Sequence, residues 1–123
     1  MASPVVHFEI VGNDAPALRA FYRAAFGWQI GAPMPGAGIA DYTLIQPAGG
    51  VGIGGGIGAA PAGYDGHVTF YVAVPDVGLT LETIERGGGT RMMGPERVPG
   101  GPVIALFRDP EGHVVDLTQT ETP

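Results

Sequence analysis

Residues 66–88 read GHVTFYVAVPDVGLTLETIERGG, and they repeat the pattern of residues 5–27, VVHFEIVGNDAPALRAFYRAAFG. Each copy begins with alternating apolar and polar residues, which is typical of a half-buried strand. Each continues with an aspartate and with apolar residues spaced three and four apart, which is typical of a capped amphipathic helix that a glycine ends. The histidines near the two starts, His7 and His67, lie 60 positions apart. A period of this length indicates a duplicated module.

Three further strand candidates follow each predicted helix. They are residues 28–34, 40–46 and 50–58 in the first copy, and residues 90–93, 102–107 and 113–119 in the second. Each copy therefore has the order strand, helix and three strands, which is a βαβββ module of the α+β class. We expect one domain, residues 1–123, made of two such modules at about 4–60 and 64–120.

The composition excludes several classes of protein. The chain has 123 residues, a net charge of −6 and six cationic residues, all of them arginines spread along the sequence. Without a basic cluster, we expect no nucleic-acid partner and no binding to anionic membranes. No apolar run approaches the roughly 20 residues of a membrane span, no signal peptide is evident, and there is no cysteine. These features predict a cytoplasmic protein, and the arginine-rich, lysine-free composition is typical of a GC-rich bacterial genome.

The stretch GVGIGGGIG at residues 50–58 raises the question of a phosphate-binding loop. Gly50, Gly52 and Gly55 match the pattern G-x-G-x-x-G. That pattern binds a nucleotide only where a helix follows, and Pro61 and Gly63 prevent a full-length helix before the next strand. We therefore interpret the stretch as a strand with few side chains, which leaves room on its inward face.

The sequence resembles the vicinal oxygen chelate superfamily, which includes glyoxalases, bleomycin-resistance proteins and extradiol dioxygenases. The motifs FYRAAFGW at residues 21–28 and DPEGHVVDL at residues 109–117 carry the resemblance most specifically. The resemblance implies two modules that pair into a half-open barrel around a small-molecule pocket. In the metal-dependent members, four side chains from the first and last strands of the modules bind one divalent ion.

Carried over to this sequence, the resemblance implies the metal ligands His7, His67 and Asp116, with aspartate where glutamate is usual. The fourth position falls among Gly54, Gly55 and Gly56, and glycine offers no ligand atom. Zn, Ni, Co, Mn or Fe(II) would suit these ligands, and the missing fourth ligand leaves open that no metal binds. We expect Gly54 and Gly56 to lie beside the substrate.

Other residues share the faces of the two histidines. Glu9 lies on the face of His7, so it is a candidate for the catalytic acid or base, for a replacement ligand, or for an arginine partner at the pocket rim. Tyr71 lies on the face of His67, so we expect it to contact the substrate. The alternatives to metal ligation are that the histidines are hydrogen-bonded pocket residues and that Asp116 faces solvent.

Two functions remain open from the sequence. One is a metal-dependent lyase, isomerase or dioxygenase that acts on a substrate with vicinal oxygens. The other is a metal-free protein that sequesters a hydrophobic or aromatic compound, as bleomycin-resistance relatives do. Both predict a small-molecule ligand, and relatives of this length predict a homodimer. The sequence alone does not decide whether the protein is an enzyme.

Overall fold

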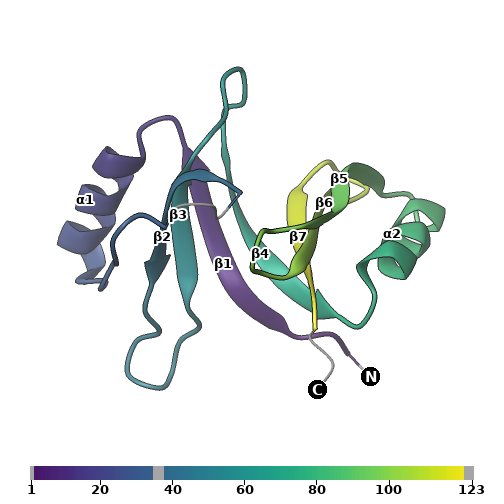
Figure 1. Cartoon of the computed structure of the whole chain (residues 1–123), viewed down its shortest axis with the longest axis horizontal. Helices are drawn as coiled ribbons and strands as arrows, with labels where there is room; N and C mark the ends of the chain where they lie inside the picture. Colours follow the sequence, from purple (N-terminus) through teal and green to yellow (C-terminus); the bar gives the residue numbers. More distant parts are fainter. Residues whose placement is uncertain (1, 35–37, 121–123) are drawn as a thin grey trace. The chain divides into compact units, whose positions relative to one another are not determined.

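A computed structural model describes residues 2–34 and 38–120 (Figure 1). Its two helices and seven strands confirm the α+β class. In chain order they are β1 (Val5–Gly12), α1 (Ala15–Phe26), β2 (Ala40–Ile45), β3 (Gly55–Ala59), β4 (His67–Val74), α2 (Val77–Arg86), β5 (Thr90–Arg97), β6 (Val103–Arg108) and β7 (Val114–Gln119).

The chain divides into two compact units, residues 7–68 and residues 1–6 with 69–123, and the boundary falls within β1 and β4. Each unit has its own core. How the two modules pair stays a prediction.

In the unit of residues 7–68, β3 runs antiparallel to β2 and parallel to β1. The helix α1 covers one face of these strands because its apolar stripe needs an apolar partner. The ring of Tyr22 on this helix stacks on Trp28, with 5.2 Å between the ring centroids. The buried core residues come from all four elements: Ile10, Ala15, Ile45 and Ile57.

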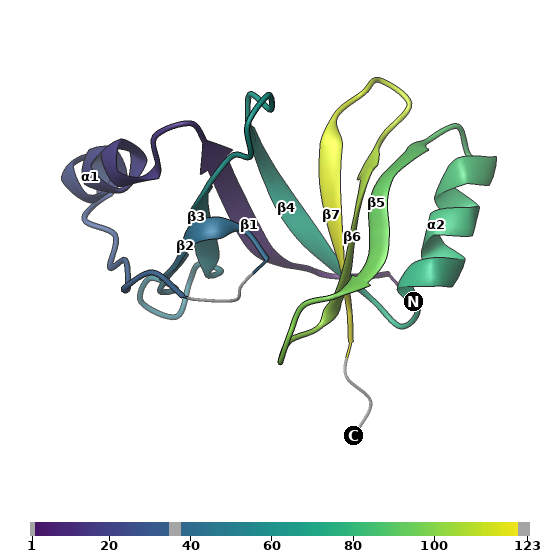
Figure 2. The same ribbon diagram turned by 45° about the horizontal axis from the view of Figure 1, so that its top comes forward.

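In the other unit, β4 runs parallel to β7, while β6 runs antiparallel to both β7 and β5. Figure 2 shows these strands side by side, with α2 next to β5. The helix packs its apolar residues against the sheet, and the buried core consists of Val74, Val77, Leu81, Ala105 and Leu117.

The helix boundaries follow the predicted capping residues. The Asp14 side chain accepts a hydrogen bond from the backbone N–H of Ala17, and Gly27 ends α1 with a left-handed φ of 67°. Asp76 caps α2 in the same way through Leu79. Side-chain caps satisfy backbone N–H groups that have no partner inside the helix.

One prediction about the strands was wrong, and another was right only in part. Residues 28–34 form no regular strand: the segment makes backbone hydrogen bonds to β2, but only Ile30 forms an isolated bridge, to Ile45. Pro33 lacks the N–H group that a continued ladder needs. The glycine-rich stretch is a strand only from Gly55 onward, because a turn occupies residues 49–52. The first module therefore has two regular strands after its helix, where three were predicted.

Candidate functional site

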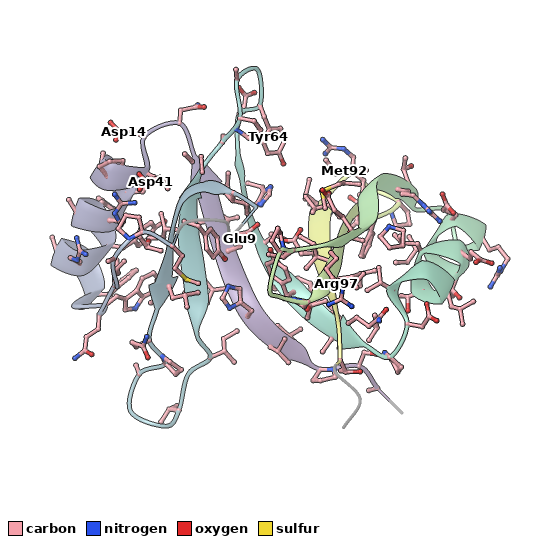
Figure 3. The ribbon with its side chains drawn as sticks, viewed as in Figure 1. Glu9, Asp14, Asp41, Tyr64, Met92 and Arg97 are labelled. Atoms are coloured by element: carbon pink, nitrogen blue, oxygen red, sulfur yellow. The ribbon has the colours of Figure 1, made fainter. Side chains whose placement is uncertain are left out.

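A chain of hydrogen bonds joins three polar side chains in the unit of residues 7–68. The Nε2 atom of His67 lies 2.8 Å from Oε2 of Glu9, and the Nδ1 atom of the same ring lies 2.7 Å from the hydroxyl of Tyr64. The side chains of His67 and Glu9 are only 8% and 1% exposed. Both ring nitrogens are therefore held by specific partners in a nearly water-free environment (Figure 3 labels Glu9 and Tyr64).

The loop before β4 places Tyr64 and His67. The backbone N–H of Tyr64 bonds to the carbonyl of Pro61, which closes a turn whose third residue, Gly63, has a φ of +83°. This backbone conformation favours glycine at that place in a turn. Gly66 has a φ of +98°, and a Cβ atom there would overlap the Val11 carbonyl. Only glycine lets the loop pass this close to β1.

His7 has a different partner. Its Nε2 atom lies 2.9 Å from the hydroxyl of Tyr42 on β2. Burial lowers the pKa of the His7 imidazole, while the negative charge of nearby Glu9 acts in the opposite direction. Glu9, on the same strand, contacts His67.

Tyr42 also changes the interpretation of the glycine-rich strand. Gly56 pairs with Glu9 across the β1–β3 ladder, and a Cβ atom on Gly56 would overlap the Tyr42 ring and hydroxyl. A Cβ atom on Gly58 would come within 2.8 Å of the same ring. The space that these glycines leave is filled by a side chain from the neighbouring strand, where the sequence suggested open room. The roles of Gly54 and Gly56 in binding a substrate stay predictions.

An irregularity in β2 accompanies this placement of Tyr42. The β2–β3 register shifts between Ala40 and Thr43, and Asp41 has a φ of +53°, which is unusual for a residue with a side chain. Arg19 on α1 bonds to both the carboxylate and the carbonyl of Asp41, at 3.3 Å in each case. Bulges re-aim side chains, and here the bulge lies directly beside Tyr42.

Two further predicted site residues lie in the other unit. Asp116 on β7 is fully buried, and its register partner on β4 is Tyr71, which is 9% exposed. Thr69, on the same face of β4, donates a hydrogen bond to the carbonyl of Val114 at 2.6 Å. The alternative that Asp116 faces solvent is wrong, because its side chain is inside the protein.

The sequence reasoning missed Tyr64. The residue lies in the glycine-containing segment AGYDGH, three positions before His67. A tyrosine at that distance across a tight turn can reach back to the histidine, so the pattern held a usable signal. His113 is exposed and bonds to Asp109 of the same turn.

A family profile described as the Glyoxalase/Bleomycin resistance protein/Dioxygenase superfamily matches residues 5–117. The chain belongs to this superfamily. The match covers both copies of the repeat, including the motifs at residues 21–28 and 109–117. It confirms the resemblance that the sequence suggested. No curated protein matches the sequence significantly.

Solved structures of superfamily members share the fold at low sequence identity. A glyoxalase/bleomycin resistance protein/dioxygenase superfamily member from Vibrio splendidus 12B01 has a TM-score of 0.64 and 14% identity, over 97% of this chain and 100% of that chain. Methylmalonyl-CoA epimerase from Mycobacterium tuberculosis has a TM-score of 0.66 and 14% identity, over 96% and 88%. A Streptomyces coelicolor methylmalonyl-CoA epimerase in complex with 2-nitronate-propionyl-CoA has a TM-score of 0.65 and 17% identity, over 99% and 100%.

Proposed function

We propose that this superfamily member binds a divalent metal ion through Glu9 and His67 and acts on a small molecule with vicinal oxygens. The observation that carries the proposal is the 2.8 Å separation of Glu9 Oε2 and His67 Nε2, both almost fully buried. A buried carboxylate is costly unless it is paired or metal-bound. The site keeps this cost low by pairing the carboxylate with an imidazole.

The donor atoms fit a metal of the expected class. Two ligands at a metal–ligand distance of about 2.1 Å and at right angles lie about 3 Å apart, close to the observed separation. Imidazole and carboxylate together suit Zn, Ni, Co, Mn and Fe(II). The chemistry and spacing of this pair are therefore compatible with the metal that the superfamily resemblance implies.

Asp116 is the third ligand in this proposal. It is a carboxylate of a metal-binding type with a fully buried side chain. His7 stays a candidate for a further ligand, but its Nε2 atom would first have to leave the hydroxyl of Tyr42. Glu9, predicted as a catalytic acid or base or as a replacement ligand, takes the role of a ligand in this proposal.

The donor set supports Lewis-acid chemistry. A bound divalent ion would supply Lewis acidity, which polarises a carbonyl oxygen and stabilises an enediolate-like anion. The similarity to methylmalonyl-CoA epimerases supports an isomerase, while lyase and dioxygenase activities stay open within the superfamily. Tyr71 is the residue that we expect to contact the substrate.

Metal titration of chelator-treated protein tests the proposal. We expect Zn, Ni, Co, Mn or Fe(II) to bind close to one ion per chain, and His67→Ala and Glu9→Gln to weaken binding at least tenfold. His113→Ala is the matched control, because this histidine is 70% exposed and its ring bonds to Asp109 of its own turn. If the wild type gives no binding heat with any of these ions, the proposal is wrong.

The metal-free alternative makes the opposite prediction. A sequestering protein would show no binding heat with these ions, but aromatic or hydrophobic compounds would stabilise it against unfolding. The filled space beside Gly56 weakens this alternative, since the missing side chains there do not leave room for a ligand.

Assembly and location stay proposals. None of the described helices is long and apolar enough to cross a membrane. We propose a cytoplasmic bacterial homodimer without nucleic-acid or membrane partners, on the strength of the composition and of the superfamily resemblance.

A further inference from the structure

We propose that Tyr64 is a positioning residue that holds the His67 ring in one orientation both with and without metal, by reversing the direction of a single hydrogen bond. The inference rests on the proposed metal site. It concerns the contacts on the two nitrogens of one imidazole, at 2.7 Å to Tyr64 and 2.8 Å to Glu9.

In the metal-free protein, Glu9 determines where the His67 proton lies. A carboxylate oxygen can only accept, so the Nε2 atom facing Glu9 carries the proton. In the neutral form of the ring, which the proposal assigns to the metal-free protein, the Nδ1 atom then has a lone pair and accepts the hydrogen bond from the hydroxyl of Tyr64. Both contacts are satisfied with the ring in a single tautomer.

Metal binding reverses this assignment. A ligating Nε2 atom must give its lone pair to the metal, so the proton of the neutral ring lies on Nδ1. Nε2 loses one proton and Nδ1 gains one, so the imidazole neither gains nor releases a proton overall. The Nδ1–H group then donates to the oxygen of Tyr64.

A hydroxyl is suited to both states because it can donate and accept. A backbone carbonyl or a carboxylate at the same place would satisfy only the metal-bound tautomer, because it cannot donate to an unprotonated Nδ1. The turn at Pro61–Tyr64 and the packing of Gly66 against β1 fix the loop that carries this hydroxyl (Figure 3). The ring is therefore preorganised for ligation before the metal arrives.

Nitrogen-15 NMR of histidine-labelled protein measures the tautomers directly, with Zn²⁺ as a diamagnetic probe. We expect wild-type His67 to carry its proton on Nε2 without Zn²⁺ and on Nδ1 with it. Tyr64→Phe removes only the hydroxyl that would accept from Nδ1–H in the metal-bound ring, so we expect the proton to stay on Nε2 without metal and Zn²⁺ binding to weaken by about tenfold or more. Tyr22→Phe, which removes a hydroxyl from the Trp28 stack, is the matched control and should leave both readouts unchanged.

The outcomes separate this inference from the proposed function. If the wild type binds Zn²⁺ but His67 keeps its proton on the same nitrogen, or if Tyr64→Phe binds Zn²⁺ as tightly as the wild type, the role of Tyr64 is overturned while the metal site stands. If wild-type protein binds neither Zn²⁺ nor the other ions, the metal site itself is overturned, and the inference falls with it.

Discussion

At the scale of single residues, the least expected feature is the fate of the glycines in β3. The sequence shows that a side chain is absent, but not what takes its place. In the structure the side chain of Tyr42 fills the space beside Gly56. The two residues lie 14 positions apart in the sequence, on neighbouring strands, so their contact depends on the β2–β3 register. Residue types and alternation predicted that Glu9 shares a face with His7. They could not predict which of the two reaches His67, because that choice depends on the path of the loop before β4.

Gly56→Ala tests whether Tyr42 fills this space. The added methyl group would overlap the tyrosine ring, so we expect the variant to lose about 1–3 kcal/mol of unfolding free energy in chemical denaturation. The displaced ring should also release His7 from its hydroxyl partner.

Gly52→Ala is the control for this change. A Cβ atom at this position has its nearest neighbour at 3.8 Å, which is an ordinary contact. The stability of Gly52→Ala should therefore stay close to that of the wild type. Equal stability of the two variants would show that the space beside Gly56 is open in solution.

At the scale of elements, the helices were the most predictable part of the molecule. Asp14 and Asp76 cap them and apolar residues recur at helical spacing, so local signals suffice. The short strands of the first module were harder, since residues 28–34 and the glycine-rich stretch depend on long-range pairing. Pro33 interrupts pairing in the first of these segments, and the turn at residues 49–52 delays the start of the strand in the second.

The turn at residues 109–113, between β6 and β7, offers a test by pH. The hydrogen bond from the backbone N–H of His113, together with those from its ring and from Glu111, holds the pKa of the Asp109 carboxyl below its usual value. A lowered folded-state pKa means that the ionised carboxylate stabilises the fold above the unfolded-state pKa, near 4. That contribution is lost as the pH falls through the folded-state pKa.

We therefore expect Asp109→Asn to lower the melting temperature at pH 6 and to have a smaller effect at pH 3. Differential scanning calorimetry of both proteins at the two pH values measures this difference. An equal loss at both pH values for Asp109→Asn would mean that the carboxylate charge does not stabilise the turn.

At the scale of the whole molecule, the α+β class was readable from the sequence because strand alternation and helical spacing recur in two stretches 60 residues apart. The duplication that this repeat indicates stays a prediction. The superfamily match over residues 5–117 agrees with the α+β class.

Metal binding should stabilise the folded chain as a whole. A ligand that binds only the native state at 100 times its dissociation constant adds about 2.7 kcal/mol to the free energy of unfolding. For a chain of this size we expect a rise of several degrees in melting temperature with the tightest-binding ion. His67→Ala should lose this rise and His113→Ala should keep it, so an equal rise in both variants would place the bound ion elsewhere.

The bond between Glu9 and His67 also bears on the history of the chain, because its two residues come from different copies of the repeat. The position equivalent to Glu9 in the second copy is Thr69, which is buried and bonded to the backbone of β7. With glutamate in one copy and threonine in the other, the two matched histidines have different polar partners: Glu9 and Tyr64 contact His67, whereas Tyr42 contacts His7. On the duplication that the sequence predicts, the two copies are therefore no longer chemically equivalent at this position.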